Sequence, residues 1–335
     1  MEPNIKINKD RKGKKRMEKK TVVFALTSSV DLAKEIVERL GLPLGKCDVL
    51  HFADGEIMVE LGESVRGKHV FIVQSTCGPV SSTIMETLIC IDACKRASAG
   101  HISVIMPYFG YARQDRKAKP RQPITSKLHA DLLEKAGANR IITMELHATQ
   151  IQGFFDIPAD DISAIPIIAQ HFKNTLNLDD IVVVSPDHGG TVRARKLAEM
   201  LHAPLAIIDK RRPKPNVAEA MNILGDVEGK VAVVIDDMVD TAGTLCAGIN
   251  MLYDKGATEV YAACVHGVLS GPAMERLRNS KLSGFVCTNT IEQKEKASTY
   301  DKMTVLSVGP ILADCIRAIE EDRPLSDVVA EYVGN

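Results

Sequence analysis

Short runs of apolar, often β-branched residues alternate with helix-period segments from residue 21 almost to the end of the chain. Runs such as 70–74, 101–106, 181–185 and 231–235 are typical of strands buried on both faces of a parallel sheet. The segments between them are long enough to form the crossover helices that parallel strands require. The alternation therefore predicts βαβ units, mostly parallel sheets and the α/β class.

The expected elements are too numerous for one compact sheet. Strands are expected at 21–26, 70–74, 101–106, 140–144, 181–185, 205–208, 231–235, 259–265, 284–288 and 304–307. Helices are expected at 29–40, 82–97, 126–136, 165–174, 192–201, 244–255, 272–279 and 311–320. We therefore expect two doubly wound domains, an N-terminal one over 21–161 and a C-terminal one over 162–319, with the tail 320–335 packing back on the first.

Composition narrows the classes of function. Of the 335 residues 45% are apolar, which allows a large core and excludes wholesale disorder. The net charge of −1 combines a basic stretch over 1–20, which we expect to be a disordered extension, with a mildly acidic remainder. That remainder argues against a broad surface for duplex DNA or specific nucleic-acid binding. No apolar run reaches the ~18–20 residues of a membrane span, and eight scattered cysteines without C-x-x-C suit reduced thiols in the cytoplasm.

Polar residues with phosphate chemistry follow the expected strand at 231–235. Asp236 and Asp237 come first, and Asp240, Thr241, Ala242, Gly243 and Thr244 lead into a helix. A small-residue turn at a helix N-terminus presents backbone N–H groups and hydroxyls to a phosphate. The acids ahead of it suit a ribose diol or a bound cation, and the structural alternative is a capped helix after a turn.

Other strand ends carry further candidate groups. His147 and Asp187 follow two strands, and an imidazole and a carboxylate could share one Mg²⁺. Gly189 and Gly190 would let a backbone approach a pyrophosphate at the next helix N-terminus. Residues 210–216 hold four cations and two prolines after the strand 205–208, which predicts a mobile, positively charged loop over 209–217. Solvated surface charge is the alternative for this loop.

The segments at 51–56, 111–115, 145–155, 185–190 and 210–213 together resemble class I ribose-phosphate pyrophosphokinase, also called phosphoribosyl-pyrophosphate synthetase. The segment 236–244 is similar to the phosphoribosyl-pyrophosphate loop of type I phosphoribosyltransferase folds. The resemblance runs in order from about residue 21 to 330. It implies two domains of the phosphoribosyltransferase kind and transfer of the pyrophosphoryl group of MgATP to the C1 hydroxyl of ribose 5-phosphate, which yields phosphoribosyl pyrophosphate and AMP.

The resemblance also implies roles for particular residues. The catalytic pair would be Lys210 and Arg212, and the ligands of Mg²⁺ would be His147 and Asp187. ATP would be bound by Phe52, Asp54, Gly55, Glu56, Arg113, Gln114 and Asp115. Ribose 5-phosphate would be bound by Arg212, Asp236, Asp237, Asp240, Thr241, Ala242, Gly243 and Thr244. The pyrophosphate loop would consist of Asp187, His188, Gly189 and Gly190.

Assembly and regulation are implied in the same way. In the family, the hairpin at 52–56 reaches the nucleotide of a neighbouring subunit, so the resemblance implies a homo-oligomer, a hexamer built from dimers. Phosphate activation and ADP inhibition use an interface site that Ser64, Arg66, Gln152 and Ser326 match in part. Pro324 stands where relatives usually carry a serine, so one hydroxyl of that site is expected to be missing.

Three other functions are compatible with parts of the sequence. A non-catalytic regulatory paralogue would be expected to have lost Lys210, Arg212 or His147, and this chain retains all three. A base-salvaging phosphoribosyltransferase would leave the ATP-side residues at 54–56 and 113–114 unexplained. A DNA-binding regulator that senses phosphoribosyl pyrophosphate would need a helix-turn-helix unit, for which residues 1–20 have no pattern.

Overall fold

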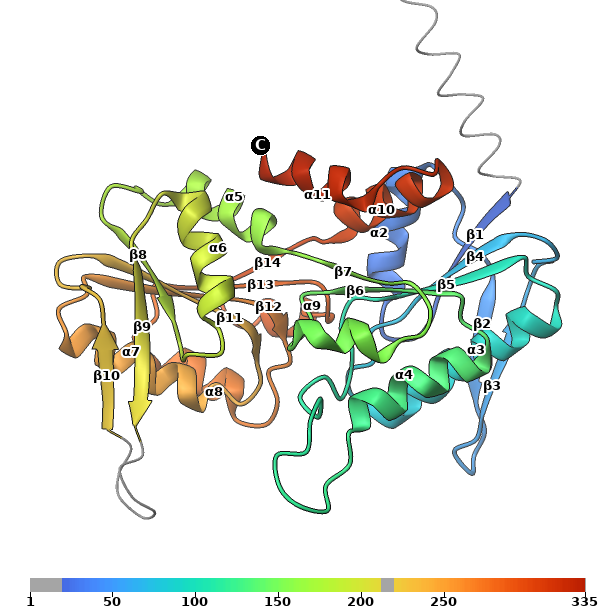
Figure 1. Cartoon of the computed structure of the whole chain (residues 1–335), viewed down its shortest axis with the longest axis horizontal. Coiled ribbons are helices and arrows are strands. Elements are labelled where there is room, and N and C mark those ends of the chain that lie inside the picture. Colours follow the sequence, from blue (N-terminus) through green and yellow to red (C-terminus); the bar gives the residue numbers. More distant parts are fainter. Residues whose placement is uncertain (1–19, 212–219, 335) are drawn as a thin grey trace, which may run out of the picture. The chain divides into compact units, whose positions relative to one another are not determined.

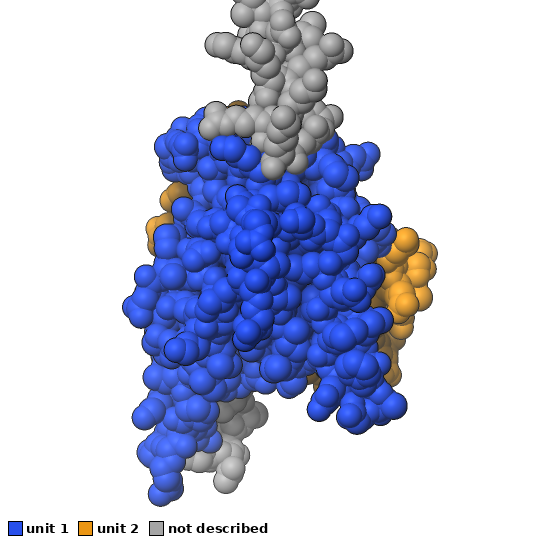
Figure 2. Space-filling view, turned by 90° about the vertical axis from the view of Figure 1, so that its right-hand side faces the viewer, with its two compact units in different colours: residues 1–162, 309–329 blue, residues 163–308, 330–335 orange. Residues whose placement is uncertain are grey.

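Residues 20–211 and 220–334 are described by the structure, which is a computed structural model. The chain divides into two compact units (Figures 1 and 2). Unit 1 comprises Met1–Ile162 and Gly309–Val329, and unit 2 comprises Ser163–Val308 and Ala330–Asn335. Each is an α/β layer structure on a mainly parallel sheet, so the predicted fold class is confirmed. None of the described helices is long and apolar enough to cross a membrane.

Unit 1 is built on a five-stranded sheet in the order β1-β4-β5-β6-β7, in which every pair is parallel. The strands are β1 (Thr21–Ala25), β4 (His69–Val73), β5 (His101–Met106), β6 (Arg140–Met144) and β7 (Ala159–Ile162). The helices are α2 (Val30–Leu40), α3 (Val80–Arg96), α4 (Thr125–Ala136), the 3₁₀ helix η1 (Thr149–Phe154) and α10 (Gly309–Glu320). Helices α3 and α4 cover one face and α2 with α10 the other (Figure 1). The β-branched strands are buried on both faces, as their continuous apolar runs require.

Unit 2 has a seven-stranded sheet in the order β10-β9-β8-β11-β12-β13-β14. Its strands are β8 (Ile181–Ser185), β9 (Leu205–Arg211), β10 (Ala220–Leu224), β11 (Val231–Val239), β12 (Glu259–Gly267), β13 (Gly284–Thr288) and β14 (Met303–Leu306). Its helices are α5 (Ile165–Thr175), α6 (Thr191–Leu201), α7 (Gly243–Asp254), α8 (Ala273–Asn279) and α9 (Lys294–Ala297), and α11 (Leu325–Val333) follows in the chain. All pairs are parallel except β9 with β10, which is antiparallel.

Helix α10 belongs to unit 1 because of its contacts with α2. The Asp314 carboxylate is largely buried and accepts hydrogen bonds from Arg39 Nε and Nη2, the latter at 2.6 Å. Arg317 Nη1 donates to the same carboxylate at 3.0 Å. The sequence placed residues 309–319 in the second domain, whereas this charged cluster and the apolar face of α10 pack them in unit 1.

Several elements escaped the sequence pattern. Strands β2 (Cys47–His51) and β3 (Ile57–Leu61) form a separate antiparallel hairpin whose residues alternate between half-buried and exposed, so neither reads as an apolar run. The prediction of a loop over 209–217 is wrong for residues 209–211, and residues 212–217 lie outside the described residues. β9 continues to Arg211 because it pairs with β10, with Lys210 opposite Met221.

We expect Arg39→Met to lower the free energy of unfolding by about 1–3 kcal/mol, because it removes charged hydrogen bonds to the buried Asp314 carboxylate. Urea unfolding followed by circular dichroism measures the change. Arg96→Met is the matched control, since Arg96 makes an exposed ion pair with Asp92 one turn away and should cost less than ~0.5 kcal/mol. Equal losses in the two variants would contradict the role of Arg39 in holding α10.

Candidate functional site

The sheet of unit 2 changes its winding direction between β8 and β11. These strands are parallel neighbours, yet α6 follows β8 on one face of the sheet and α7 follows β11 on the other (Figure 1). The loops after the two strands therefore diverge and leave the carboxyl edge open between them. Such a topological switch point is where doubly wound sheets bind ligands. Both candidate phosphate loops of unit 2, 187–190 and 240–244, begin at this edge.

The loop before α7 presents backbone N–H groups that no described residue binds. The N–H groups of Ala242, Gly243 and Thr244 donate no hydrogen bond within 20–211 and 220–334, and the hydroxyl-bearing Thr241 and Thr244 are exposed. Ala242 is held at φ 58°, in the left-handed region that L-residues rarely adopt. Unpaired N–H groups at the positive end of a helix dipole are suited to bind a phosphate.

The two acids of this segment lie within β11, whose pairing with β12 extends to Val239. Arg193 of α6 lies between them, with Nη1 at 3.6 Å from Asp236 Oδ1 and 3.5 Å from Asp237 Oδ1. Burial, followed by the charge of Asp237, raises the pKa of Asp236 to about 8, and Arg193 offsets part of this. One carboxyl of the pair thus keeps its proton near neutral pH and can both donate to and accept from a hydroxyl.

The loop after β8 is folded around its own polar groups. Asp187 Oδ1 accepts a hydrogen bond from the N–H of Gly190 at 3.0 Å, and Ser185 Oγ donates to the Asp187 carbonyl at 2.7 Å. His188 Nε2 lies 3.0 Å from Oδ1 of Asp209, a buried residue directly before Lys210 in β9. The loop and the strand that carries Lys210 are therefore joined. Arg212 lies outside the described residues.

In unit 1, the exposed His147 follows β6 on a backbone that β7 holds. Glu145 has φ 46°, and its N–H donates to the Ile162 carbonyl at 3.0 Å. The Asp161 carboxylate accepts hydrogen bonds from the Leu146 N–H at 3.1 Å and from Thr143 Oγ1 at 3.1 Å. These contacts fix the turn that places His147 at the carboxyl edge of the unit 1 sheet. His147 belongs to unit 1 and Asp187 to unit 2.

The segment with Arg113, Gln114 and Asp115 follows β5, and the contacts of Gly110 with Thr76 and His129 hold the chain that leads into it. Gly110 donates its N–H to Thr76 Oγ1 at 2.6 Å, and a Cβ on Gly110 would lie 2.5 Å from the Thr76 carbonyl oxygen. Burial lowers the pKa of His129 to about 4, and this neutral ring contacts the Gly110 carbonyl through Nδ1 at 3.2 Å. Arg113 remains exposed at the surface, where it can meet an anion.

The other residues predicted to bind ATP make hydrogen bonds to residues near them or lie on the exposed β2–β3 hairpin. Gln114 accepts a hydrogen bond from Thr125 Oγ1 at 2.5 Å, and Gln150 Nε2 donates to Asp115 at 2.9 Å. Phe52 lies at the tip of the β2–β3 hairpin and is 51% exposed. Gly55 has φ 94°, and Glu56 donates its N–H to Asp54 Oδ1 at 3.0 Å. The hairpin tip thus presents an aromatic ring and two carboxylates to the exterior.

The four residues expected at a regulatory site all lie in unit 1 without bonding to one another. Arg66 Nη1 donates to Ser98 Oγ at 3.1 Å, Gln152 Nε2 to the Thr149 carbonyl at 3.3 Å, and Ser326 Oγ to Asp327 at 3.5 Å. Ser64 makes no hydrogen bond with any residue in the described part of the chain. Within one chain these side chains do not form a site.

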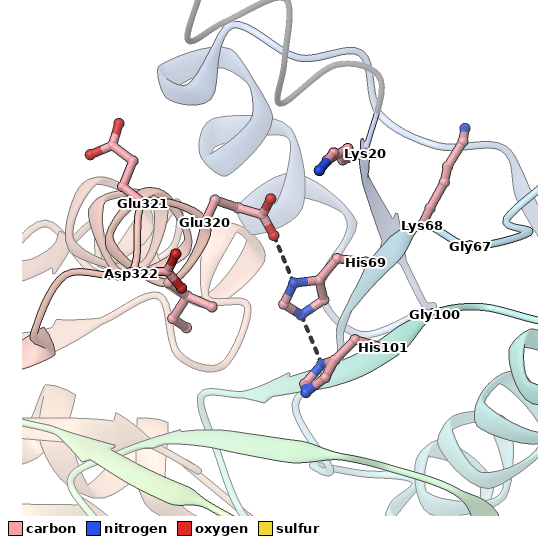
Figure 3. A pocket seen from close by; sticks show the side chains of 10 residues that line it. Lys20, Gly67, Lys68, His69, Gly100, His101, Glu320, Glu321 and Asp322 are labelled. Carbon is pink, nitrogen blue, oxygen red and sulfur yellow. Dashed lines mark hydrogen bonds and ion pairs between the residues drawn. The ribbon is translucent and has the colours of Figure 1, made fainter.

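A cavity of about 610 Å³ lies at the opposite edge of the unit 1 sheet, where β4 and β5 begin (Figure 3). In it the Glu320, His69 and His101 side chains point toward one another. His69 Nδ1 is 2.7 Å from Glu320 Oε1, and His69 Nε2 is 3.1 Å from His101 Nδ1. No residue of the predicted catalytic site lines this cavity. The candidate phosphate-binding residues lie at the carboxyl edges of the sheets and not in this cavity.

Three contact residues were not singled out from the sequence. Arg193 could have been found from the sequence, because it lies one helical turn before Leu197 on the apolar stripe of α6. A cation at such a position needs a buried partner, which here is Asp237. Asp209 directly follows the apolar run within β9, as Asp236 follows the apolar run within β11. Asp161 had no local signal, since only the β6–β7 pairing brings it to Leu146. In the described residues, no group of three or more His, Cys, Asp or Glu side chains comes together as a metal site.

Comparison with known proteins gives consistent results along the chain. A family model described as the N-terminal domain of ribose phosphate pyrophosphokinase matches residues 21–137, and one described as the phosphoribosyl synthetase-associated domain matches 211–329. The ribose-phosphate pyrophosphokinase of Halalkalibacterium halodurans is 59% identical over 91% of this chain and 96% of its own length. That of Bacillus subtilis is 55% identical over 92% of this chain and 97% of its own length.

A solved structure gives the same result in three dimensions. The crystal structure of phosphoribosylpyrophosphate synthetase from Mycobacterium smegmatis matches with a TM-score of 0.86 and 41% sequence identity. The match covers 90% of this chain and 99% of that one.

The raised pKa of Asp236 predicts a pH dependence of stability. The pKa is about 8 in the fold against a reference value of 3.8, so the stabilisation present at low pH is lost as pH rises from about 4 to about 8. Asp236→Asn removes this titration, and we expect it to be more stable than the wild type by about 1 kcal/mol at pH ~8.5, with less difference near pH ~5. The side chain is 34% exposed, so solvent screening keeps the effect small.

Urea unfolding at several pH values measures this dependence. Asp226→Asn is the control, because Lys230 lowers the pKa of the exposed Asp226 and its removal cannot produce the same gain at high pH. Parallel pH profiles for the wild type and Asp236→Asn would show that Asp236 titrates normally.

Proposed function

This chain belongs to the ribose-phosphate pyrophosphokinase family, and from that membership we propose the reaction and the roles of its site residues. The enzyme transfers the pyrophosphoryl group of ATP to the C1 hydroxyl of ribose 5-phosphate, giving phosphoribosyl pyrophosphate and AMP. The single observation that carries the reaction is the identity of 55–59% to enzymes of that name over nine-tenths of the chain. The C1 hydroxyl attacks the β-phosphorus in line, and AMP leaves.

Ribose 5-phosphate is held at the carboxyl edge of β11. The unpaired N–H groups at 242–244 and the hydroxyls of Thr241 and Thr244 bind the 5-phosphate. Asp236 and Asp237 bind the ribose hydroxyls, since a pair that shares a proton can donate to one hydroxyl and accept from another. Asp240 is the third carboxylate proposed to bind ribose 5-phosphate. This arrangement positions the C1 hydroxyl for attack.

The diphosphate that moves lies between two sources of positive potential. Asp187, His188, Gly189 and Gly190 lead into the N-terminus of α6, whose dipole favours an anion there. Lys210 and Arg212 are the catalytic cations, which neutralise charge on the transferring group as the transition state forms. The contact from His188 to Asp209 supports this placement, because it joins the loop to the residue before Lys210.

His147 and Asp187 are the proposed ligands of Mg²⁺. The Asp187 carboxylate would supply an oxygen ligand of the kind that Mg²⁺ prefers and His147 would supply a nitrogen ligand, and both side chains are exposed after the ends of strands. The bound ion supplies neutralisation of phosphate charge. Asp161 and Glu145 hold the turn that carries His147, and the Asp187 carboxylate is oriented by the Gly190 N–H.

ATP binds to unit 1 and to a second copy of the chain. Arg113 meets the polyphosphate, with Gln114 and Asp115 beside it, and Phe52 stacks on the adenine of a neighbouring subunit. Asp54 and Glu56 accept hydrogen bonds from the base, and Gly55 makes the turn between them. The exposed hairpin tip supports this role, because about half of the Phe52 surface is open to contact with another molecule. The active form is accordingly a homo-oligomer, a hexamer built from dimers, and its free cysteines suit the cytoplasm.

We expect Lys210→Ala to reduce kcat on the order of 10²–10³-fold while the fold is retained, because one cation on the transferring group is lost. The assay is AMP release from ATP that depends on ribose 5-phosphate. Lys230→Ala is the control, since Lys230 pairs with Asp226 at the opposite end of β11. Near-wild-type kcat in Lys210→Ala would remove Lys210 from the mechanism, and absent AMP release in the wild type would favour a non-catalytic paralogue.

Regulation by ADP and phosphate is proposed to involve Ser64, Arg66, Gln152 and Ser326. Pro324 supplies no hydroxyl, so we expect phosphate to relieve ADP inhibition only weakly, with less than ~10-fold recovery at saturation. Activity titrated with phosphate at fixed ADP measures this effect. Pro324→Ser should strengthen the response, and an equally weak response in that variant would exclude the missing hydroxyl as its cause.

A further inference from the structure

The segment that follows β12 binds three successive carbonyl groups of the ribose-phosphate loop. The N–H of Leu269 donates to the Val239 carbonyl, and that of Ser270 to the Asp240 carbonyl, both at 2.9 Å. The third carbonyl, that of Thr241, accepts from a side chain instead, Nη1 of Arg276 on α8, also at 2.9 Å. The loop is therefore braced by one neighbouring segment, and at Thr241 the brace is a guanidinium.

Arg276 occupies space that a side chain at position 243 would need. Its Nη1 atom lies 3.1 Å from where a Cβ on Gly243 would stand, so the guanidinium lies against the start of α7. A cation is unfavourable at a helix N-terminus, and Arg276 has no carboxylate partner in the part of the chain that the structure describes. Its charge therefore serves something other than the stability of α7.

The geometry of the peptide unit between Thr241 and Ala242 explains what the charge of Arg276 can do. The Thr241 carbonyl and the Ala242 N–H belong to the same planar trans peptide, so they point in opposite directions. A donor fixed on the carbonyl thereby fixes the direction of the N–H, and a charged donor polarises the peptide and strengthens the N–H as a donor. This N–H is one of those that no described residue binds.

The conformation of Ala242 shows why the peptide needs to be held. With φ at 58°, Ala242 is in the strained left-handed region. Rotating the peptide 241–242 by about half a turn would return Ala242 to a relaxed backbone conformation and would direct its N–H away from the loop. The contact from Arg276 opposes this rotation, because the rotated carbonyl could no longer accept from Nη1.

We propose that Arg276 is a positioning residue for ribose 5-phosphate, which acts by holding the Thr241–Ala242 peptide with its N–H directed at the 5-phosphate. This inference rests on the proposed function. Arg276 touches the loop backbone from behind and does not take part in the chemistry. Its loss should therefore weaken the binding of ribose 5-phosphate and leave the binding of ATP unchanged.

The test compares Arg276→Met with Arg278→Met. Both remove an exposed arginine from α8, and Arg278 contacts Thr299 and no loop residue. We expect the KM for ribose 5-phosphate to rise at least 10-fold in Arg276→Met and less than 2-fold in Arg278→Met, with the KM for ATP within 2-fold in both. Calorimetric titration with ribose 5-phosphate, in Mg²⁺ and a non-hydrolysable ATP analogue, should give the same ratio of Kd values without turnover.

A second substitution separates this role from a general loss of structure. Glycine at 242 adopts a positive φ without strain, so Ala242→Gly in the Arg276→Met background should lower the KM for ribose 5-phosphate about 3–5-fold relative to Arg276→Met. Wild-type Kd and KM in Arg276→Met, equal effects in the two methionine variants, or no recovery with glycine would each overturn the proposal. A wild-type protein without ribose-5-phosphate-dependent AMP release would instead overturn the proposed function.

Discussion

The parallel pairing of β8 with β11 is the constraint on which the site of unit 2 depends. Because α6 and α7 leave these neighbouring strands on opposite faces, the two loops cannot close over each other, and the sheet edge between them stays open. Both loops end at a helix N-terminus, so both supply positive potential to the same edge. A substrate that is a sugar phosphate receiving a diphosphate suits such an edge, since it needs two anion sites side by side.

Strained backbone lies next to several of the residues proposed to bind substrate or metal. Tyr111, two residues before Arg113, has a left-handed φ of 63°. Glu145, two residues before His147, has a φ of 46°, and Ala242 in the loop 240–244 has a φ of 58°. Each such residue costs on the order of 1 kcal/mol, so the surrounding contacts must hold it in place. The Ile162 carbonyl accepts the N–H of Glu145, and next to Ala242 the Thr241 carbonyl accepts from Arg276 Nη1.

Much of the fold could be predicted from the sequence, because strands that are buried on both faces consist of continuous runs of apolar residues. The runs at 181–185 and 231–235 gave β8 and most of β11, and the turn chemistry after them located the loops. The hairpin β2–β3 was missed because its exposed alternation hides the pattern, and β10 because it is recognised only through its pairing with β9. Contacts between distant segments, such as Asp161 with Leu146, follow from strand order, which single-sequence patterns do not supply.

The carboxyl pair in β11 shows how the fold prepares a site at a cost in stability. Two adjacent acids at the end of a buried strand repel each other, and burial raises the pKa of Asp236 to about 8, although Arg193 lies within 3.6 Å of it. A fold selected only for stability would place a hydrogen-bonded neutral residue there. The cost is understandable if the pair binds the hydroxyls of a sugar, as proposed above, because a protonated and an ionised carboxyl together can donate and accept hydrogen bonds. Arg193 on α6 and Arg276 on α8 each offset an unfavourable feature of this segment: Arg193 lies beside the two repelling carboxylates, and Arg276 binds the carbonyl next to the strained Ala242.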